Sequence, residues 1–153
     1  MKILKIFKPL LLIFFLLTNC GYQLVNKEFS TKIISYEISG NNKVNRKLGN
    51  NFDRFKEIQD FKKEIIIKGN SSISKQVTSK DTQGNELSYS MMIDLELEII
   101  DKNNSSNEIV TFNKNTFYNN LNSKFELKRY EQLKLNELID QLIVDINNYL
   151  NDN

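Results

Sequence analysis

The chain has 153 residues, with 21 lysines and arginines against 19 aspartates and glutamates, no histidine and one cysteine. Without histidine it lacks the commonest general base and the commonest metal ligand, and its five scattered glycines cannot build a phosphate-binding loop. We therefore expect neither an enzyme nor a cofactor or metal site. The balanced charge gives no reason to expect a nucleic-acid partner.

The first residues have the order of a secretory signal. The first eight residues hold Lys2, Lys5 and Lys8 and no acidic residue, and an apolar run from Leu10 to Leu17 follows. This run is eight residues long, whereas a helix needs about twenty to span a bilayer. We therefore expect residues 1–19 to be a cleaved signal peptide. Its removal leaves 18 basic against 19 acidic residues, a net charge of about −1.

The only cysteine follows this apolar run directly. The segment Leu17-Thr18-Asn19-Cys20 resembles a bacterial lipobox, which implies that Cys20 is alkylated by a diacylglycerol and becomes an acylated N-terminus. An unpaired thiol is awkward in an oxidising compartment, whereas two or more acyl chains hold a protein stably on a membrane. Gly21, rather than Asp, comes next, which favours the outer membrane. The alternative is an ordinary secretory signal with an incidental cysteine.

Residues 20–31 are expected to form the lipidated N-terminus and a short tether, and residues 32–153 a single domain. The segment Lys32 to Ser39 alternates apolar and polar side chains, which predicts a half-buried strand. A helix is predicted from about Asn42 to Gln59, because one of its faces is apolar. The apolar residues behind these two predictions are Ile34, Tyr36, Ile38, Val44, Leu48, Phe52 and Phe55.

Two short strands are predicted next. The first covers residues 64–68 and is expected to end at Gly69-Asn70. Because a strand, a helix and a second strand usually form a right-handed crossover, this strand should lie parallel to the strand that precedes the helix. The second is a polar strand over residues 72–80, followed by a turn at 81–85.

Residues 87–99 alternate strictly between apolar and polar side chains, so this strand should have one buried side and one wet side. A last strand is predicted over residues 108–119. Its alternation slips between Phe112 and Phe117, which predicts a bulge or a bend. The apolar positions of the alternating strand are Leu87, Tyr89, Met91, Ile93, Leu95, Leu97 and Ile99.

A long terminal helix is predicted from about Lys128 to Asn151, because its apolar residues form one stripe at helical spacing. We expect this stripe to cover the sheet. The order of elements predicts an α+β fold, a two-layer sandwich in which a four- to five-stranded, mostly antiparallel sheet carries two helices on one face.

Nucleophilic catalysis has weak candidates. A Ser-Lys pair would need Ser74 with Lys75 or Ser79 with Lys80, but adjacent residues on a strand point to opposite faces. A periplasmic hydrolase is therefore the least favoured of the hypotheses.

Acidic and basic side chains offer surface candidates instead. Asp94, Glu96 and Glu98 share one face of a strand, and we interpret them as a solvated sheet surface. Lys75 and Lys80 flank the predicted turn and could meet phosphates or an acidic partner. Ordinary solvation is the simpler explanation of these lysines.

The residues resemble a known family. The start Cys20-Gly21-Tyr22-Gln23-Leu24 resembles the opening of mature lipopolysaccharide-assembly lipoproteins of the LptE type, and the following strand with its amphipathic helix is similar to that family's next block. The later segment Phe117-Tyr118-Asn119, followed by Phe125, Glu131 and a long terminal helix, is similar to its alphaproteobacterial branch.

The resemblance implies a lipoprotein on the periplasmic side of the outer membrane. Such a protein plugs the LptD β-barrel, helps that barrel assemble, and assists delivery of lipopolysaccharide to the outer leaflet. Lys75 and Lys80 would then be the candidates for contact with lipopolysaccharide phosphates, through charge-assisted hydrogen bonds. The alternative is a lipid-anchored accessory, of the pilotin or barrel-assembly type, of another outer-membrane machine.

Overall fold

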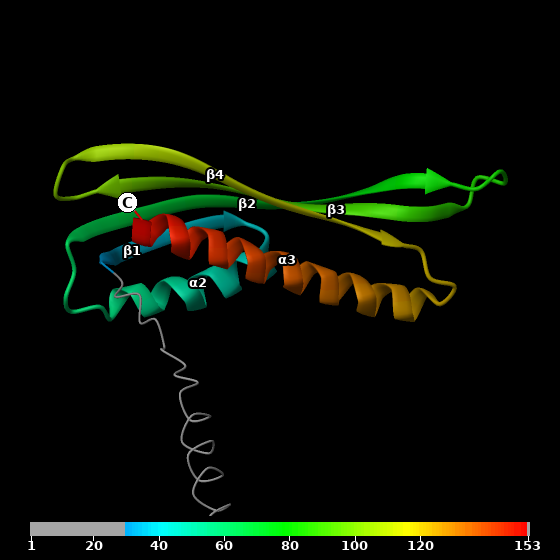
Figure 1. Ribbon diagram of the computed structural model, residues 1–153, viewed down its shortest axis with the longest axis horizontal. Coiled ribbons are helices and arrows are strands. Elements are labelled where there is room, and N and C mark those ends of the chain that lie inside the picture. The colour runs from blue at the N-terminus through cyan, green and yellow to red at the C-terminus, as the bar shows by residue number, and fades with distance from the viewer. Residues whose placement is uncertain (1–29, 153) are drawn as a thin grey trace, which may run out of the picture.

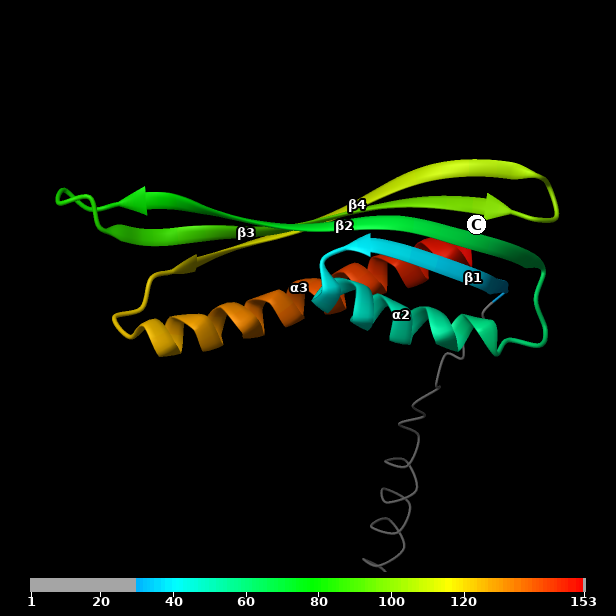
Figure 2. The ribbon, with the colours of Figure 1, turned by 180° about the vertical axis from the view of Figure 1, so that it is seen from behind.

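Two helices cover one face of a four-stranded sheet in the computed structural model, which describes residues 30–152 (Figure 1 and Figure 2). The predicted α+β two-layer fold is confirmed. The predictions for the signal peptide and Cys20 lie outside the described residues. In chain order the elements are β1 (Thr31–Gly40), α2 (Asn42–Lys56), β2 (Lys63–Lys80), β3 (Glu86–Asp101), β4 (Ser106–Asn119) and α3 (Lys124–Asp152).

The strands lie in the sheet in chain order, β1-β2-β3-β4. β1 and β2 are parallel, as the strand-helix-strand order predicted, and α2 is the crossover between them. β2, β3 and β4 form an antiparallel meander. The two ends of the sheet differ (Figure 1): the chain enters β1 and leaves α3 at one end, while the β2–β3 hairpin and the start of α3 lie at the other.

The predicted break at Gly69-Asn70 is wrong, and the sheet has four strands, within the predicted four to five. β2 runs unbroken from Lys63 to Lys80, and Gly69 pairs in register with Leu97. A Cβ at Gly69 would lie 2.7 Å from the Leu97 side chain. This glycine therefore makes room for close packing inside a strand, and it does not mark a turn.

Two details of the strand alternation also differ from the predictions. In β1 the register shifts between Ile33 and Ser35, so that Ile33 is fully buried and Ile34 is 43% exposed. The bulge predicted in β4 is absent, because β4 pairs with β3 without a register shift. Phe112 and Phe117 lie on opposite faces of this regular strand, one 9% and the other 67% exposed.

The core lies between the helices and the inner face of the sheet. The predicted stripes of both helices pack there, with Leu135 and Ile143 of α3 only partly buried, although α2 ends at Lys56 and α3 begins at Lys124. Seven alternating positions of β3 were predicted to be buried, and all are except Leu87, which is 48% exposed beyond the helices. The fully buried side chains include Ile33, Leu48, Phe52, Ile65, Ile67, Ile93, Leu95, Leu97, Ile139, Leu142 and Ile146.

A tight junction joins β1, α2 and β2. Gly40 ends β1 with a φ of +99°, and the Asn41 side chain caps α2 by accepting hydrogen bonds from the Lys43 and Val44 amides. The Asn41 amide donates to the Ser71 carbonyl at 3.1 Å. A Cβ at Gly40 would lie only 1.9 Å from that carbonyl oxygen. Only glycine fits this position without moving β2.

We expect Gly40→Ala to lower the free energy of unfolding by about 3 kcal/mol or more, because backbone strain adds to the clash with Ser71. Gly84→Ala is the matched control, since Gly84 has a φ of +87° but nothing within 4 Å of an added Cβ. It should cost only about 1–2 kcal/mol. Urea unfolding followed by circular dichroism measures both, and equal losses would contradict the role of the close approach to Ser71.

Candidate functional site

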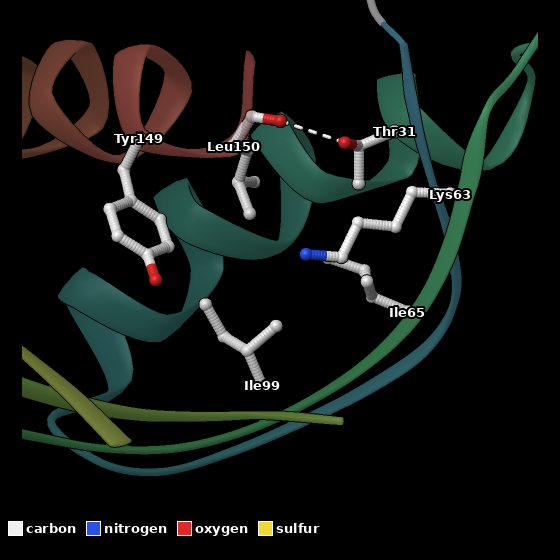
Figure 3. A pocket seen from close by; sticks show the side chains of 6 residues that line it. All are labelled: Thr31, Lys63, Ile65, Ile99, Tyr149 and Leu150. Atoms are coloured by element: carbon white, nitrogen blue, oxygen red, sulfur yellow. Dashed lines mark hydrogen bonds between the residues drawn. The ribbon is translucent and has the colours of Figure 1, made fainter. Parts of the chain in front are cut away.

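The end of the sheet where the chain enters is closed by a contact between β1 and α3. The Thr31 hydroxyl donates to the Leu150 carbonyl at 2.7 Å, although 119 positions separate these residues. Beside this bond lies a hollow with room for about one water molecule, which excludes a ligand site there. Figure 3 shows the residues that line it, which are Thr31, Lys63, Ile65, Ile99, Tyr149 and Leu150.

Asp101 closes the β3–β4 turn at the same end. Its carboxylate accepts hydrogen bonds from the Asn103 and Asn104 amides, and the Lys63 amine lies 3.8 Å away. Burial alone would raise the pKa of Asp101, but these amides, the Asn104 side chain and Lys63 together hold it below its usual range. This carboxylate therefore has a structural partner for each of its oxygens.

A cluster of tyrosines and one ion pair joins α3 to the hairpin end of the sheet. The Lys75 amine of β2 pairs with the Glu131 carboxylate of α3 and lies 3.9 Å from the centre of the Tyr89 ring. The Tyr118 hydroxyl donates to the same Glu131 oxygen at 3.0 Å. Tyr118 also stacks on Tyr89, with ring centres 5.4 Å apart.

Tyr118 is the most perturbed of these groups. Burial, helped by the hydrogen bond to Glu131, raises the pKa of Tyr118 well above its usual value. Its hydroxyl therefore stays protonated and acts as a donor at physiological pH. The cluster is a hydrogen-bonded contact between a strand and a helix, in which the charges of Lys75 and Glu131 neutralise each other.

The structure separates the two lysines that were singled out from the sequence. Lys75 lies on the helix-covered face, and Glu131 neutralises its charge within the chain. Lys80 is exposed at the end of β2, and among residues 30–152 it makes no salt bridge. Of the two predicted contacts with lipopolysaccharide, Lys80 is therefore the one whose charge is not paired within residues 30–152.

The candidates for nucleophilic chemistry do not form a site. Because Lys75 is engaged with Glu131 on the helix-covered face, it points away from the neighbouring Ser74. The Ser79 hydroxyl lies 2.6 Å from that of Ser88, in an exposed hydroxyl pair. Within the part of the chain that the structure describes, no group of three metal-ligating side chains is assembled.

The carboxylates of β3 lie on the helix-free face, where the alternation predicted them. Glu98 accepts a hydrogen bond from the Asn107 side chain at 2.7 Å, and the Lys68 amine lies 3.9 Å from it. Glu96 is exposed, while Asp94 is half-buried.

No helix within residues 30–152 is long and apolar enough to cross a membrane.

A set of exposed apolar side chains at the hairpin end was not predicted. Two of its members, Val77 and Leu87, are exposed because β2 and β3 continue past the region that the helices cover (Figure 1). The other two, Leu121 and Phe125, lie in the β4–α3 loop and in the first turn of α3. Only the length of these strands signals this feature in the sequence. The set consists of Val77 (38% exposed), Leu87 (48%), Leu121 (38%) and Phe125 (77%).

Three solved structures with a similar arrangement of strands and helices are those of lipoproteins. Rare lipoprotein B of Shewanella oneidensis superposes with a TM-score of 0.57 at 13% identity, over 73% of this chain and 89% of its own. A minor lipoprotein of Acinetobacter baumannii has a TM-score of 0.54 at 12% identity, over 81% and 94% of the two chains. For lipoprotein B of Nitrosomonas europaea the values are 0.53 and 14%, over 83% and 88%.

This chain has their fold. Because the identities lie between 12% and 14%, the likeness concerns the fold and does not transfer a function or a site. No family model and no curated protein matches the sequence. The predicted likeness to envelope lipoproteins is therefore supported by structure alone.

We expect Glu131→Ala to lower the free energy of unfolding by about 1–3 kcal/mol, because it leaves both Lys75 and the half-buried Tyr118 hydroxyl without their acceptor. Glu137→Ala is the matched control on the same helix. It removes only an exposed pair with Lys134 and should cost about 0.3 kcal/mol. Urea unfolding measures both variants, and a Glu131→Ala loss as small as the control's would show that the cluster adds no stability.

Proposed function

We propose that this chain is a lipoprotein on the periplasmic side of the outer membrane, anchored through Cys20, that serves a β-barrel resembling LptD. In this role it plugs the barrel, helps it assemble, and assists transport of lipopolysaccharide and its insertion into the outer leaflet. The observation that carries the proposal is the fold shared with three solved lipoproteins. The proposal assigns no catalytic step to the chain.

The dimensions and polarity of the molecule support a role inside a large barrel. β2 has 18 residues, and at about 3.3 Å per residue it spans roughly 60 Å. The helix-free face along this length is mostly polar, with Ser, Asn and Gln on β2 and acidic residues on β3. Large outer-membrane barrels enclose a polar, wet lumen. A long, narrow body with a polar face suits such a space.

The two ends of the sheet suit different tasks. Eleven residue steps separate Cys20 from Thr31, so a lipid on Cys20 would keep the entry end within roughly 40 Å of the membrane surface. The hairpin end, with Lys80 and its exposed apolar set, lies at the far end of the sheet (Figure 1). This is the end that offers both a free amine for phosphates and apolar surface for acyl chains.

The anchor can be tested directly. We expect mass spectrometry of the mature chain to find a diacylglyceryl and acyl group on Cys20 at its N-terminus and no trace of residues 1–19. Cys20→Ser should abolish both the acylation and the cleavage at that position. A mature chain with an unmodified Cys20, released into the periplasm, would contradict the anchor.

The partner can be tested by purification from native membranes. We expect the chain, extracted in mild detergent at its native expression level, to co-purify with a large outer-membrane β-barrel that mass spectrometry identifies as LptD-like. Recovery with a secretin or a barrel-insertion component would favour the accessory alternative. Recovery as a free chain would contradict both.

A further inference from the structure

The free edges of the sheet are protected unequally. Unpaired strand edges invite pairing with another chain, and proteins usually blunt them with bulges, prolines or lysines. β1 carries a register shift beside Ile34. The stretch of β2 beyond Ser71, which β1 does not reach, carries register shifts between Val77 and Lys80 and two lysines. β4 has none of these protections.

β4 is a regular edge strand with no charged side chain on its helix-free face. It has no register shift and no proline over its 14 residues. Its lysine, Lys114, is turned to the helix side and paired with Asp145 at 2.6 Å. Glu108 lies on that side too, where its carboxylate accepts a hydrogen bond from the Tyr149 hydroxyl. Among the described residues, no backbone hydrogen bond joins β4 to anything beyond its outer edge.

The helix-free side of β4 is uncharged and partly apolar. Two of its side chains, Ile109 and Phe117, are each 67% exposed, the highest value for any apolar side chain of the sheet. Polar amides and one hydroxyl lie between them. The full set on this side is Asn107, Ile109, Thr111, Asn113, Asn115, Phe117 and Asn119.

We propose that β4 pairs antiparallel with β4 of a second copy of this chain, about a two-fold axis that passes through Asn113. Ile109 and Phe117 lie four positions on either side of Asn113. In this register each copy's Ile109 therefore stands opposite the other copy's Phe117. The two most exposed apolar side chains of the sheet bury each other, once on each side of the axis, as directly opposed aromatic and β-branched pairs do in sheets.

The charges of β4 are compatible with this register. Glu108 faces Tyr118, and Lys114 faces Phe112, so that no charge meets a like charge. The Asn113 side chains face each other on the axis, where their amides can exchange hydrogen bonds. The two sheets join into one continuous sheet with all helices on the same side.

Neighbouring registers would pair the side chains of the two copies less favourably. A slip of one residue would turn the helix-facing side chains of one copy to the free face of the other. A two-fold axis through Lys114 would place the two lysines opposite each other. An axis through Phe112 would set Ile109 against Asn115 and leave Phe117 against Asn107. Only the axis through Asn113 matches the apolar pair.

The first test uses a pair of matched charge variants of the full chain in mild detergent, measured by sedimentation velocity over a concentration series. The mass of the parent chain should rise from one copy to two. Asn113→Lys places like charges on the axis and should weaken dimerisation at least tenfold. This change should not destabilise the monomer, because position 113 lies opposite Asp94 of β3, whose carboxylate can pair with the added charge.

Asn115→Lys is the control, because it adds the same charge on the same face of the same strand but opposite Thr111 of the other copy. It should change the dissociation constant by less than about threefold. Equal weakening by both variants would overturn the register. A parent chain that stays a single copy at every concentration would overturn the proposal.

A second test fixes the register by disulfide formation in a Cys20→Ser chain produced without residues 1–19, where an introduced thiol is the only one. Asn113→Cys should give a covalent dimer, because opposed Cα atoms in an antiparallel pair lie about 4.5–5.5 Å apart. Thr111→Cys should give none, since its two copies would be displaced along the strand by four residues, about 13 Å. Crosslinking at Thr111→Cys equal to that at Asn113→Cys would contradict the axis. Failure here leaves co-purification with a barrel unaffected, so the two proposals fail separately.

Discussion

The long antiparallel ladder between β2 and β3 is the constraint on which the rest of the molecule depends. It runs from the pair Ile65–Asp101 to the pair Lys80–Glu86 and connects the two ends of the sheet. β1 and α2 attach to its first half, and α3 crosses beneath β4 to reach both halves. Because β3 alternates strictly and β2 pairs with it in register as far as Val77, the ladder presents one largely apolar side to both helices and leaves the other side polar. The core and the free face follow from that single pattern.

Periodicity predicted the elements that are regular and failed where a single residue has a special role. The alternation of β3 and the stripe of α3 are long enough that competing patterns do not fit, and both were predicted. Gly69 looked like a turn because local sequence cannot show that the Leu97 side chain fills the missing Cβ position. Likewise, the bulge beside Ile34 depends on pairing with β2, which the sequence of β1 does not contain.

The features of the site likewise divide into those that the local sequence predicts and those that depend on long-range contacts. Lys75 and Lys80 look alike in the sequence, and the difference between them comes from Glu131, a partner 56 positions away that neutralises only Lys75. Tyr118 and Glu131 were noticed for their likeness to a family, but their hydrogen bond arises only when α3 folds back under β4. The exposed side chains Val77 and Leu87 follow from how far the hairpin outruns the helices, which is a matter of tertiary geometry. Long-range contacts of this kind leave no local signal.

The bond between Thr31 and the Leu150 carbonyl has a mechanical consequence. A chain held by its N-terminal residues receives any pulling force at the first residue of β1. Because β1 pairs with β2 along most of its length, a pull directed along β1 would load these ladder hydrogen bonds together in shear rather than open them one after another. The contact with α3 shares this load at the point of entry. The fold is thus arranged to withstand tension at the residue where an anchored chain would be pulled.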